Sequence, residues 1–440
     1  MSFEFLWTDK CFLILLLLGF ITIVFSLRKR PVRHSFLMIL QRPIAVSAAI
    51  VLVVFLCIGI LDSIHFKSKD SGSENAVSLL DKILSPLSDS YEKTYSAPLA
   101  LHLFVSETEL INGVAQQVYP RLIYPPEWMK TKADKNRFIR NSLWSAFGFA
   151  TLIIAGIFAL LLVLRRQFSP SLYSALFTSW ILLFLMLSSF WISRNLHVFG
   201  TGQIGQDVFY FSIKSIRTGL VIGTLTTLFM LPLALFLGIV AGYFGGVVDD
   251  VIQYIYTTLS SIPGVLLITA SVLSLQTYIS SHPEQFTTLA QAADARLLAL
   301  CMILGVTSWT SLCRLLRAEA LKLREVDYVL AARALGSSWF KIIRKHLLPN
   351  VMHIIVITLV LDFSFLVMAE AVLSYVGVGV SPMTISWGNM INGARLELAR
   401  DPVVWWPMFA AFILMFFLVL AINLFADAVR DAFDPHQAHL

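Results

Sequence analysis

Long, continuous apolar stretches separated by polar segments dominate this chain. A helix that crosses a bilayer needs about 20 mostly apolar residues. Stretches of this kind occur at approximately Cys11–Leu27, Pro43–Leu61, Leu143–Leu164, Leu172–Ile192, Gly219–Val247, Val251–Ser280, Leu297–Leu316, Val351–Tyr375 and Val403–Ala426. Their apolar residues are continuous rather than alternating, which predicts helices rather than barrel strands, because a helix satisfies its own backbone hydrogen bonds. The pattern predicts an all-α polytopic membrane protein with about nine transmembrane helices.

Composition supports a membrane protein and excludes other classes. Of 440 residues, 57% are hydrophobic and only 14% are charged, which excludes a soluble chain, a disordered chain and a collagen-like repeat. Four cysteines lie in apolar segments without paired spacing, so we expect packing residues rather than a disulfide framework or a metal site. The net charge of +6 is interpreted as a topology signal and not as nucleic-acid binding.

Basic residues in short loops predict the orientation. Lys and Arg accumulate on the cytoplasmic side of membrane proteins. Three loops that alternating spans place on one side are basic: residues 28–42, the turn with Arg165 and Arg166, and residues 314–349 with eight Lys or Arg. We therefore expect an extracytoplasmic N-terminus, a cytoplasmic C-terminus and an extracytoplasmic region at 62–141. The first apolar run lacks a basic n-region and a small-residue cleavage site, so a cleaved signal peptide is not expected.

The loop after the seventh span has a helical pattern on both sides of a glycine. The pattern predicts a helix from about Glu319 to Leu335 that ends at Gly336, the residue best suited to the left-handed conformation after a helix. A second short helix is predicted from Trp339 to His346, and Pro349 marks the start of the next span. The sequence therefore predicts helix, glycine turn and helix on the cytoplasmic face.

Two interpretations of this loop remain open from its residues alone. Small side chains at Ala331 and Ala332, beside the larger Tyr328 and Leu335, would suit close docking of another protein. An amphipathic helix lying on anionic lipid would also explain the loop. The basic residues that favour lipid are Arg333, Lys341, Arg344 and Lys345.

The same loop resembles a known family. The run from Asp327 to Gly336, followed by His346-Leu347-Leu348-Pro349-Asn350, resembles the EAA loop of bacterial ABC-importer permeases. In that family the loop forms the coupling helices that sit in a groove of the ATPase subunit. The resemblance implies ATPase coupling by Asp327, Tyr328, Ala331, Ala332, Leu335, Gly336 and Pro349. Leu330 replaces the first Glu of the family motif, and His346 replaces an isoleucine.

Other motifs narrow the resemblance to the C-type permease subunit of dipeptide, oligopeptide and nickel importers. In chain order they are His197-Val198-Phe199-Gly200-Thr201 with Gly205 and Asp207, Ala241–Gly246 with Asp249, Glu370–Val380, Ser386–Met390 and Arg430–Pro435. Gly202 and Gln206 replace the Asp and Arg usual in the first motif. This departure leaves open whether the motif makes the family's polar contacts outside the membrane.

The resemblance implies a domain organisation. A five-helix ABC type I importer core (MetI-like) would occupy 195–440, with the coupling loop at about 317–349, and the family's N-terminal span would be 43–61. An extra N-terminal span with a basic cytoplasmic loop (1–42), the extracytoplasmic region (62–141) and an inserted transmembrane hairpin (142–194) would be additions, whose roles the resemblance leaves open.

The resemblance also implies a function in the bacterial inner membrane. The chain would form half of the pathway of an ATP-driven importer, with a homologous second permease, two ABC ATPase subunits or domains, an extracytoplasmic solute-binding protein and membrane lipid as partners. Peptides are the expected cargo; dipeptides, longer peptides, nickel chelates and antimicrobial peptides all fit the family. The sequence has no G-x-x-x-x-G-K-[ST] loop, so ATP hydrolysis is expected on separate subunits, and no cofactor is expected.

Two acids and two prolines within the spans are further candidates. Asp362 and Glu370 are about 12 Å apart along a helix and about 80° around it, so they could face one translocation pathway. Alternatively, Glu370 makes a structural hydrogen bond and Asp362 pairs with the partner permease. The acids also permit a different function, a proton-coupled secondary transporter, and a scaffold protein is a third class. Pro232 and Pro263 could supply gate bends, or be ordinary prolines of membrane helices.

Overall fold

The computed structural model describes residues 2–3, 6–28, 30–67, 76–111, 114–164, 169–282 and 288–433. Nine helices in this part of the chain are long and apolar enough to cross a membrane, which confirms the polytopic helical prediction. Lys29, Arg165 and Arg166, which support the predicted orientation, lie outside the described residues, as do Asp434 and Pro435 of the last motif.

The chain forms two compact units, each assembled from separate segments. Unit 1 comprises Met1–Phe5, Leu37–Thr218 and Ile385–Ala421, and unit 2 comprises Leu6–Phe36, Gly219–Thr384 and Ile422–Leu440. Three helices continue from one unit into the other: α2 (Arg30–Gln41), α8 (Val208–Phe244) and α16 (Trp406–Phe433).

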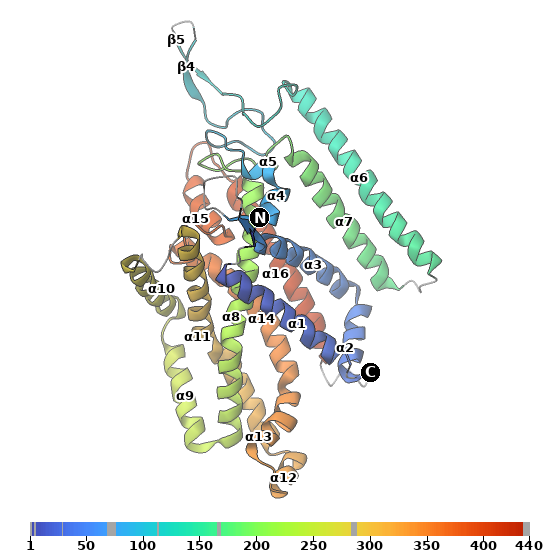
Figure 1. The fold of residues 1–440 in the computed structure, drawn as a ribbon, viewed down its shortest axis with the longest axis vertical. Coiled ribbons are helices and arrows are strands. Elements are labelled where there is room, and N and C mark those ends of the chain that lie inside the picture. Colours follow the sequence, from blue (N-terminus) through green and yellow to red (C-terminus); the bar gives the residue numbers. More distant parts are fainter. Residues whose placement is uncertain are drawn as a thin grey trace. The chain divides into compact units, whose positions relative to one another are not determined.

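Three long helices of unit 1 pack together: α3 (Pro43–Ser63), α6 (Lys132–Val163) and α7 (Pro170–Ser193). Figure 1 shows α6 and α7 running side by side. Small polar side chains join α3 to α7, since Ser47 Oγ lies 2.6 Å from Ser174 Oγ and Thr178 Oγ1 donates to Ser47 Oγ at 2.8 Å. Hydrogen bonds of this kind hold helices together where lipid offers no hydrophobic drive for association.

Helix α6 begins earlier than the predicted third span. Thr131 Oγ1 accepts a hydrogen bond from the Asp134 backbone, and the Asp134 side chain accepts one from the Thr131 backbone, which makes a complete capping box. The helix therefore starts at Lys132 rather than near Leu143. Its 32 residues span about 48 Å, whereas the hydrocarbon core is about 30 Å thick. The polar first turns thus extend beyond the apolar layer.

Apart from its parts of α2, α8 and α16, the rest of unit 1 consists of short elements. Strands β1 (Ser2–Phe3), β2 (His65–Lys67) and β3 (Ala76–Ser78) form an antiparallel sheet, and β4 (Glu107–Ile111) pairs with β5 (Val114–Val118) in a hairpin. Short helices α4 (Leu79–Ile83) and α5 (Ser85–Ser88) follow β3, and α15 (Trp387–Glu397) precedes α16. The extracytoplasmic region predicted at 62–141 therefore contains small folded elements.

Unit 2 is built around one long helix. It contains α1 (Trp7–Ser26), α9 (Gly246–Ser261), α10 (Gly264–Ser281), α11 (Leu289–Arg324), α12 (Asp327–Ala334), α13 (Trp339–Ile342), the π-helix η2 (Ile343–Leu347) and α14 (Leu348–Val376), together with most of α8. Helix α11 packs against α1, α9, α10 and α14. The Thr8 backbone donates to Asp294 Oδ2 at 3.2 Å, and its hydroxyl donates to the other oxygen. This pair attaches α1 to α11.

The predicted sixth span, Val251–Ser280, is two helices rather than one. Helix α9 ends at Ser261 and α10 begins at Gly264, and only α10 is long and apolar enough to span. The break has a local cause, because a proline disfavours the helical conformation of the residue before it. Ile262, which precedes Pro263, is extended, with ψ of 129°. Pro263 therefore separates two helices, whereas Pro232 lies inside the continuous helix α8.

Candidate functional site

The loop between α11 and α14 contains two short helical segments with a turn between them. The helix predicted from Glu319 to Leu335 is interrupted, because α11 ends at Arg324 and α12 begins at Asp327. Val326 is extended and its side chain packs against the apolar core of unit 2. An extended, anchored Val326 cannot continue α11, so α12 starts in a new direction.

The turn at Gly336 closes α12 as predicted. The Ser337 N–H donates to the Ala332 carbonyl at 3.1 Å, and the Gly336 N–H donates to the Arg333 carbonyl at 3.0 Å. These two bonds form a Schellman motif, which requires a left-handed residue after the helix. Gly336 has φ of +73°, where a side chain would be strained but would meet no neighbouring atom within 4 Å.

The chain then returns to the membrane without a break. Segments α13, η2 and α14 follow one another directly, and together they form a candidate span from Trp339 to Val376. Pro349 therefore lies within the first turn of α14 and does not start a separate helix. The wider π turn, Ile343–Leu347, ends two residues before this proline, which has no N–H to donate.

The predicted coupling loop (residues 317–349), called the coupling loop below, has a buried base and an exposed tip. Val329 is 1% exposed, and Ile342 and Leu347 are fully buried in the core of unit 2. Leu335 at the tip is 86% exposed. Ala331 and Gly336 are exposed beside it, and Ala332 is half-buried. The base fixes the loop to α11 and α14, while the tip presents an apolar side chain with small neighbours.

Tyr328 joins the two sides of the loop. The Asn350 side-chain amide donates to the Tyr328 hydroxyl at 3.0 Å, and the rings of Tyr328 and His346 lie 5.9 Å apart. These contacts connect α12 with η2 and α14, so the two sides of the loop are held as one body.

An ion pair lies at the start of the coupling loop. Arg317 on α11 donates through Nη2 to Asp249 Oδ2 on α9 at 2.6 Å, and its Nε donates to the other carboxylate oxygen. The hydrogen bonds from Arg317 hold the pKa of the Asp249 carboxyl below its usual value. This two-point geometry fixes α9 to α11 beside the loop.

Glycines in the Ala241–Gly246 motif permit close helix packing. A Cβ atom at Gly242 would lie 2.5 Å from the Ala320 Cβ and 2.7 Å from the Arg317 carbonyl oxygen. Helix α8 can therefore approach α11 this closely only because residue 242 has no side chain. Gly245 ends α8 with φ of +67°, a conformation that glycine adopts without strain.

The two acids of α14 have different surroundings. Glu370 is buried and accepts a hydrogen bond from the Ser374 hydroxyl, one turn later, at 2.7 Å. Asp362 is half-buried, and no hydrogen bond or ion pair joins it to another described residue. The roles of the two acids in a pathway, and those of Pro232 and Pro263 in a gate, stay predictions.

A buried polar cluster in unit 1 surrounds His197. His197 Nδ1 lies 2.6 Å from Asp207 Oδ2, and Nε2 lies 3.7 Å from Glu92 Oε1. Burial opposes the charged form of His197, but the bonds and charges of Asp207 and Glu92 outweigh it and raise its pKa to about 9. The ring of Tyr124 stacks on the imidazole at 4.7 Å. This cluster joins the family-like run at 197–207 to the loop region at 76–131.

Sequence reasoning missed Glu92 and a second ion-pair cluster. Lys214 on α8 donates to Asp81 and lies 3.6 Å from Asp62 Oδ1. Burial raises the pKa of the Asp81 carboxyl, but the charge of Lys214 and the hydrogen bonds from Lys214, Tyr210 and Ser78 together outweigh it, and the net shift is downward. Asp62 lies at the end of α3, Asp81 in the short helix α4 and Glu92 in an irregular segment, where no periodic pattern identifies a partner.

Comparison with known proteins identifies the family. Residues 234–439 match the model of the binding-protein-dependent transport system inner membrane component. The chain is 32% identical to a putative peptide transport system permease protein of Brucella suis biovar 1 over 241 residues, 54% of this chain and 73% of that protein. The chain belongs to this family. The permease core therefore lies in its C-terminal half, and the chain is a multi-pass inner-membrane permease component, not an ATPase.

Other relatives carry related names. The dipeptide transport system permease protein DppC of Lactococcus lactis subsp. cremoris is 34% identical over 56% of this chain and 65% of its own length. The oligopeptide transport system permease protein OppC of Bacillus subtilis is 28% identical over 54% of this chain and 72% of its own length. A solved structure of the MetNI methionine ABC transporter is 19% identical over 51% of this chain and 97% of that chain, with a TM-score of 0.39.

Proposed function

We propose that this chain is the permease subunit of an ATP-driven importer of peptides and that its coupling loop docks on an ATPase subunit. It forms half of the translocation pathway, and a homologous second permease forms the other half. Two ABC ATPase subunits and an extracytoplasmic solute-binding protein complete the complex. The N-terminus is extracytoplasmic and the C-terminus cytoplasmic, as the basic loops predict.

The division of the coupling loop into buried base and exposed tip carries this proposal. Helix α12 joins α11 through two residues, and α13 continues into α14 through η2, so no flexible linker separates the tip from the membrane helices. Val329, Ile342 and Leu347 fix the base. A displacement of the tip by an ATPase is therefore transmitted to α11 and α14 as a rigid-body movement.

The same geometry argues against a loop that merely lies on lipid. An interfacial helix turns an apolar face to the membrane, but the apolar Val329 of α12 points into the protein. Tyr328, Leu330, Trp339 and Phe340 are 41–59% exposed, and Leu335, the most exposed of the loop at 86%, follows the helix at the turn. A protruding tip of this kind fits a pocket on a partner protein.

Peptide cargo is supported by the names of the relatives, which include dipeptide and oligopeptide permeases. Asp362 is chemically suited to the ammonium group of a peptide, because a carboxylate within a membrane span needs a cationic or polar partner. Glu370, which accepts a hydrogen bond from Ser374, would stabilise the same helix along the pathway. Bends at Pro232 and Pro263 would permit gating of the pathway.

Uptake of a radiolabelled dipeptide, measured in cells with and without this chain, tests the proposal. The importer reading predicts uptake that depends on the chain, stops when ATP is depleted and continues with a protonophore while ATP is maintained. The competing function is a proton-coupled carrier that uses Asp362. It predicts uptake that stops with a protonophore and continues when ATP is depleted. Dipeptide uptake unaffected by loss of the chain would exclude this cargo.

A further inference from the structure

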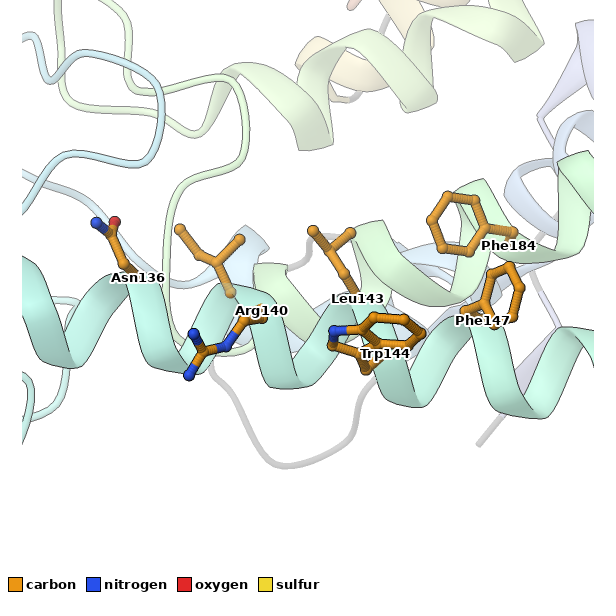
Figure 2. A pocket seen from close by; sticks show the side chains of 7 residues that line it. Asn136, Arg140, Leu143, Trp144, Phe147 and Phe184 are labelled. Carbon is orange, nitrogen blue, oxygen red and sulfur yellow. The ribbon is translucent and has the colours of Figure 1, made fainter.

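A groove in unit 1 combines a basic end with an apolar floor. It lies along α6 and is closed on one side by α7, with a volume of about 550 Å³. Its lining residues are Asn136, Ile139, Arg140, Leu143, Trp144, Phe147 and Phe184. Figure 2 shows Asn136 and Arg140 at one end and Phe147 and Phe184 at the other. The volume is in the range of small-molecule sites, about 300–1,000 Å³.

The sequence of α6 places the two ends of the groove at different depths in the bilayer. From Lys132 to Asn141 the helix is mainly polar, and from Leu143 to Val163 it is apolar. The apolar part, about 30 Å long at 1.5 Å per residue, matches the hydrocarbon core. Arg140 is the last charged residue before it and therefore lies at headgroup level. The aromatic floor lies at the level of the acyl chains.

Arg140 is exposed and available to a ligand. No hydrogen bond or ion pair joins Arg140 or Asn136 to another residue in the described part of the chain. Two nearby charges are engaged elsewhere: the Lys135 ammonium donates to the Leu99 carbonyl at 3.0 Å, and Asp134 caps α6 through Thr131. The basic end of the groove is thus formed by a guanidinium and an amide, both suited to donate to phosphate oxygens.

The apolar floor is preformed by packed aromatic rings. Phe147 meets Trp144 edge-on at 6.0 Å and Phe184 of α7 at 6.4 Å. Trp144 belongs to a membrane helix and is 68% exposed, as expected for a tryptophan that contacts lipid near the interface.

We propose that this groove binds one anionic phospholipid. Its phosphate is held by Arg140 and Asn136, and one acyl chain lies over Leu143, Phe147 and Phe184. The groove lies outside residues 234–439, which match the family model, so the site is separate from the permease core. The inference requires only that α6 spans the membrane and does not rest on the peptide cargo or on ATPase docking.

Lipid titration followed by native mass spectrometry tests the headgroup. The full chain in detergent is titrated with phosphatidylglycerol and with phosphatidylcholine of the same acyl chains. We expect one tightly bound phosphatidylglycerol per chain and weaker binding of phosphatidylcholine. Arg140→Gln should weaken phosphatidylglycerol binding about tenfold, the loss of one charge-assisted hydrogen bond. The matched control, Arg137→Gln, removes an exposed arginine that does not line the groove and should leave binding unchanged.

A second pair of variants tests the floor. Phe184→Ala removes one wall and should weaken binding of both lipids. The matched control, Phe177→Ala, removes an exposed phenylalanine of α7 outside the groove and should leave binding unchanged. Equal losses in Arg140→Gln and Arg137→Gln would overturn the proposal in favour of general attraction to a basic surface. Equal binding of the two lipids, or no effect of Phe184→Ala, would also overturn it. Melting temperatures of all four variants establish that each is folded.

Discussion

Truncation of the leucine at the tip of the coupling loop probes ATPase docking directly. Leu335→Ala removes an apolar side chain that is 86% exposed in the isolated chain, so the free permease loses almost no packing. If the tip enters a pocket on an ATPase, burial of this side chain contributes to binding only in the complex.

The size of the effect follows from the atoms removed. Leucine has three more carbons than alanine, and each buried carbon contributes about 0.8 kcal/mol. Because the side chain starts 86% exposed, nearly the whole value is available on docking. We therefore expect a loss of about 2 kcal/mol, which weakens association about 30-fold. The melting temperature of the free permease should change little.

The assay is a titration of purified ATPase subunit against fluorescently labelled permease in lipid nanodiscs. Leu289→Ala is the matched control, since Leu289 is 78% exposed and lies at the far end of α11, about 53 Å along the helix from Arg324. An unchanged dissociation constant for Leu335→Ala, or an equal loss for Leu289→Ala, would refute the docking geometry.

Three further predictions concern the stability of the folded chain. Gly242→Ala should destabilise the protein by about 1–3 kcal/mol, because a Cβ has no room there, whereas Gly264→Ala, with open space, should not; fluorescence-detected melting in detergent compares them. Asp249→Asn should cost about 1–2 kcal/mol, since it removes the charged partner of the partly buried Arg317; a melting temperature equal to that of the unchanged chain would show that the pair contributes nothing. The pKa of His197 is raised from 6.5 to about 9, so its stabilisation is complete below pH 6.5 and lost as pH rises through 9. The hydrogen-exchange protection of residues 195–207, taken relative to the intrinsic exchange rate at each pH, should therefore fall over this range, and His197→Gln should abolish that fall.

Periodicity and glycine chemistry allowed the helices and the turn at Gly336 to be predicted from sequence. Continuous apolar runs identify membrane helices because the bilayer imposes both length and apolarity. Only glycine adopts the left-handed conformation at low cost after a helix, so the end of α12 was also predictable.

Helix breaks and long-range pairs could not be derived in the same way. The apolar run through Pro263 looks continuous, yet the proline separates α9 from α10. Val326 interrupts a helical pattern because its side chain packs against the core, a tertiary effect that no local pattern records. Glu92 lies 105 residues before His197 in an irregular segment, and only the folded chain brings the two together.

Affinity purification of the tagged chain from its native membrane in mild detergent, followed by mass spectrometry, tests the central claim most directly. The account predicts recovery of an ATPase subunit with a phosphate-binding loop, together with a second permease. Gly336→Asp should lose the ATPase while still inserting, because aspartate tolerates the left-handed conformation better than most residues and meets no neighbour there, but it places a charge at the docking surface. Ala331→Glu should have the same effect. Recovery of the chain alone, even after crosslinking, would contradict ATPase coupling and favour proton-driven transport through Asp362.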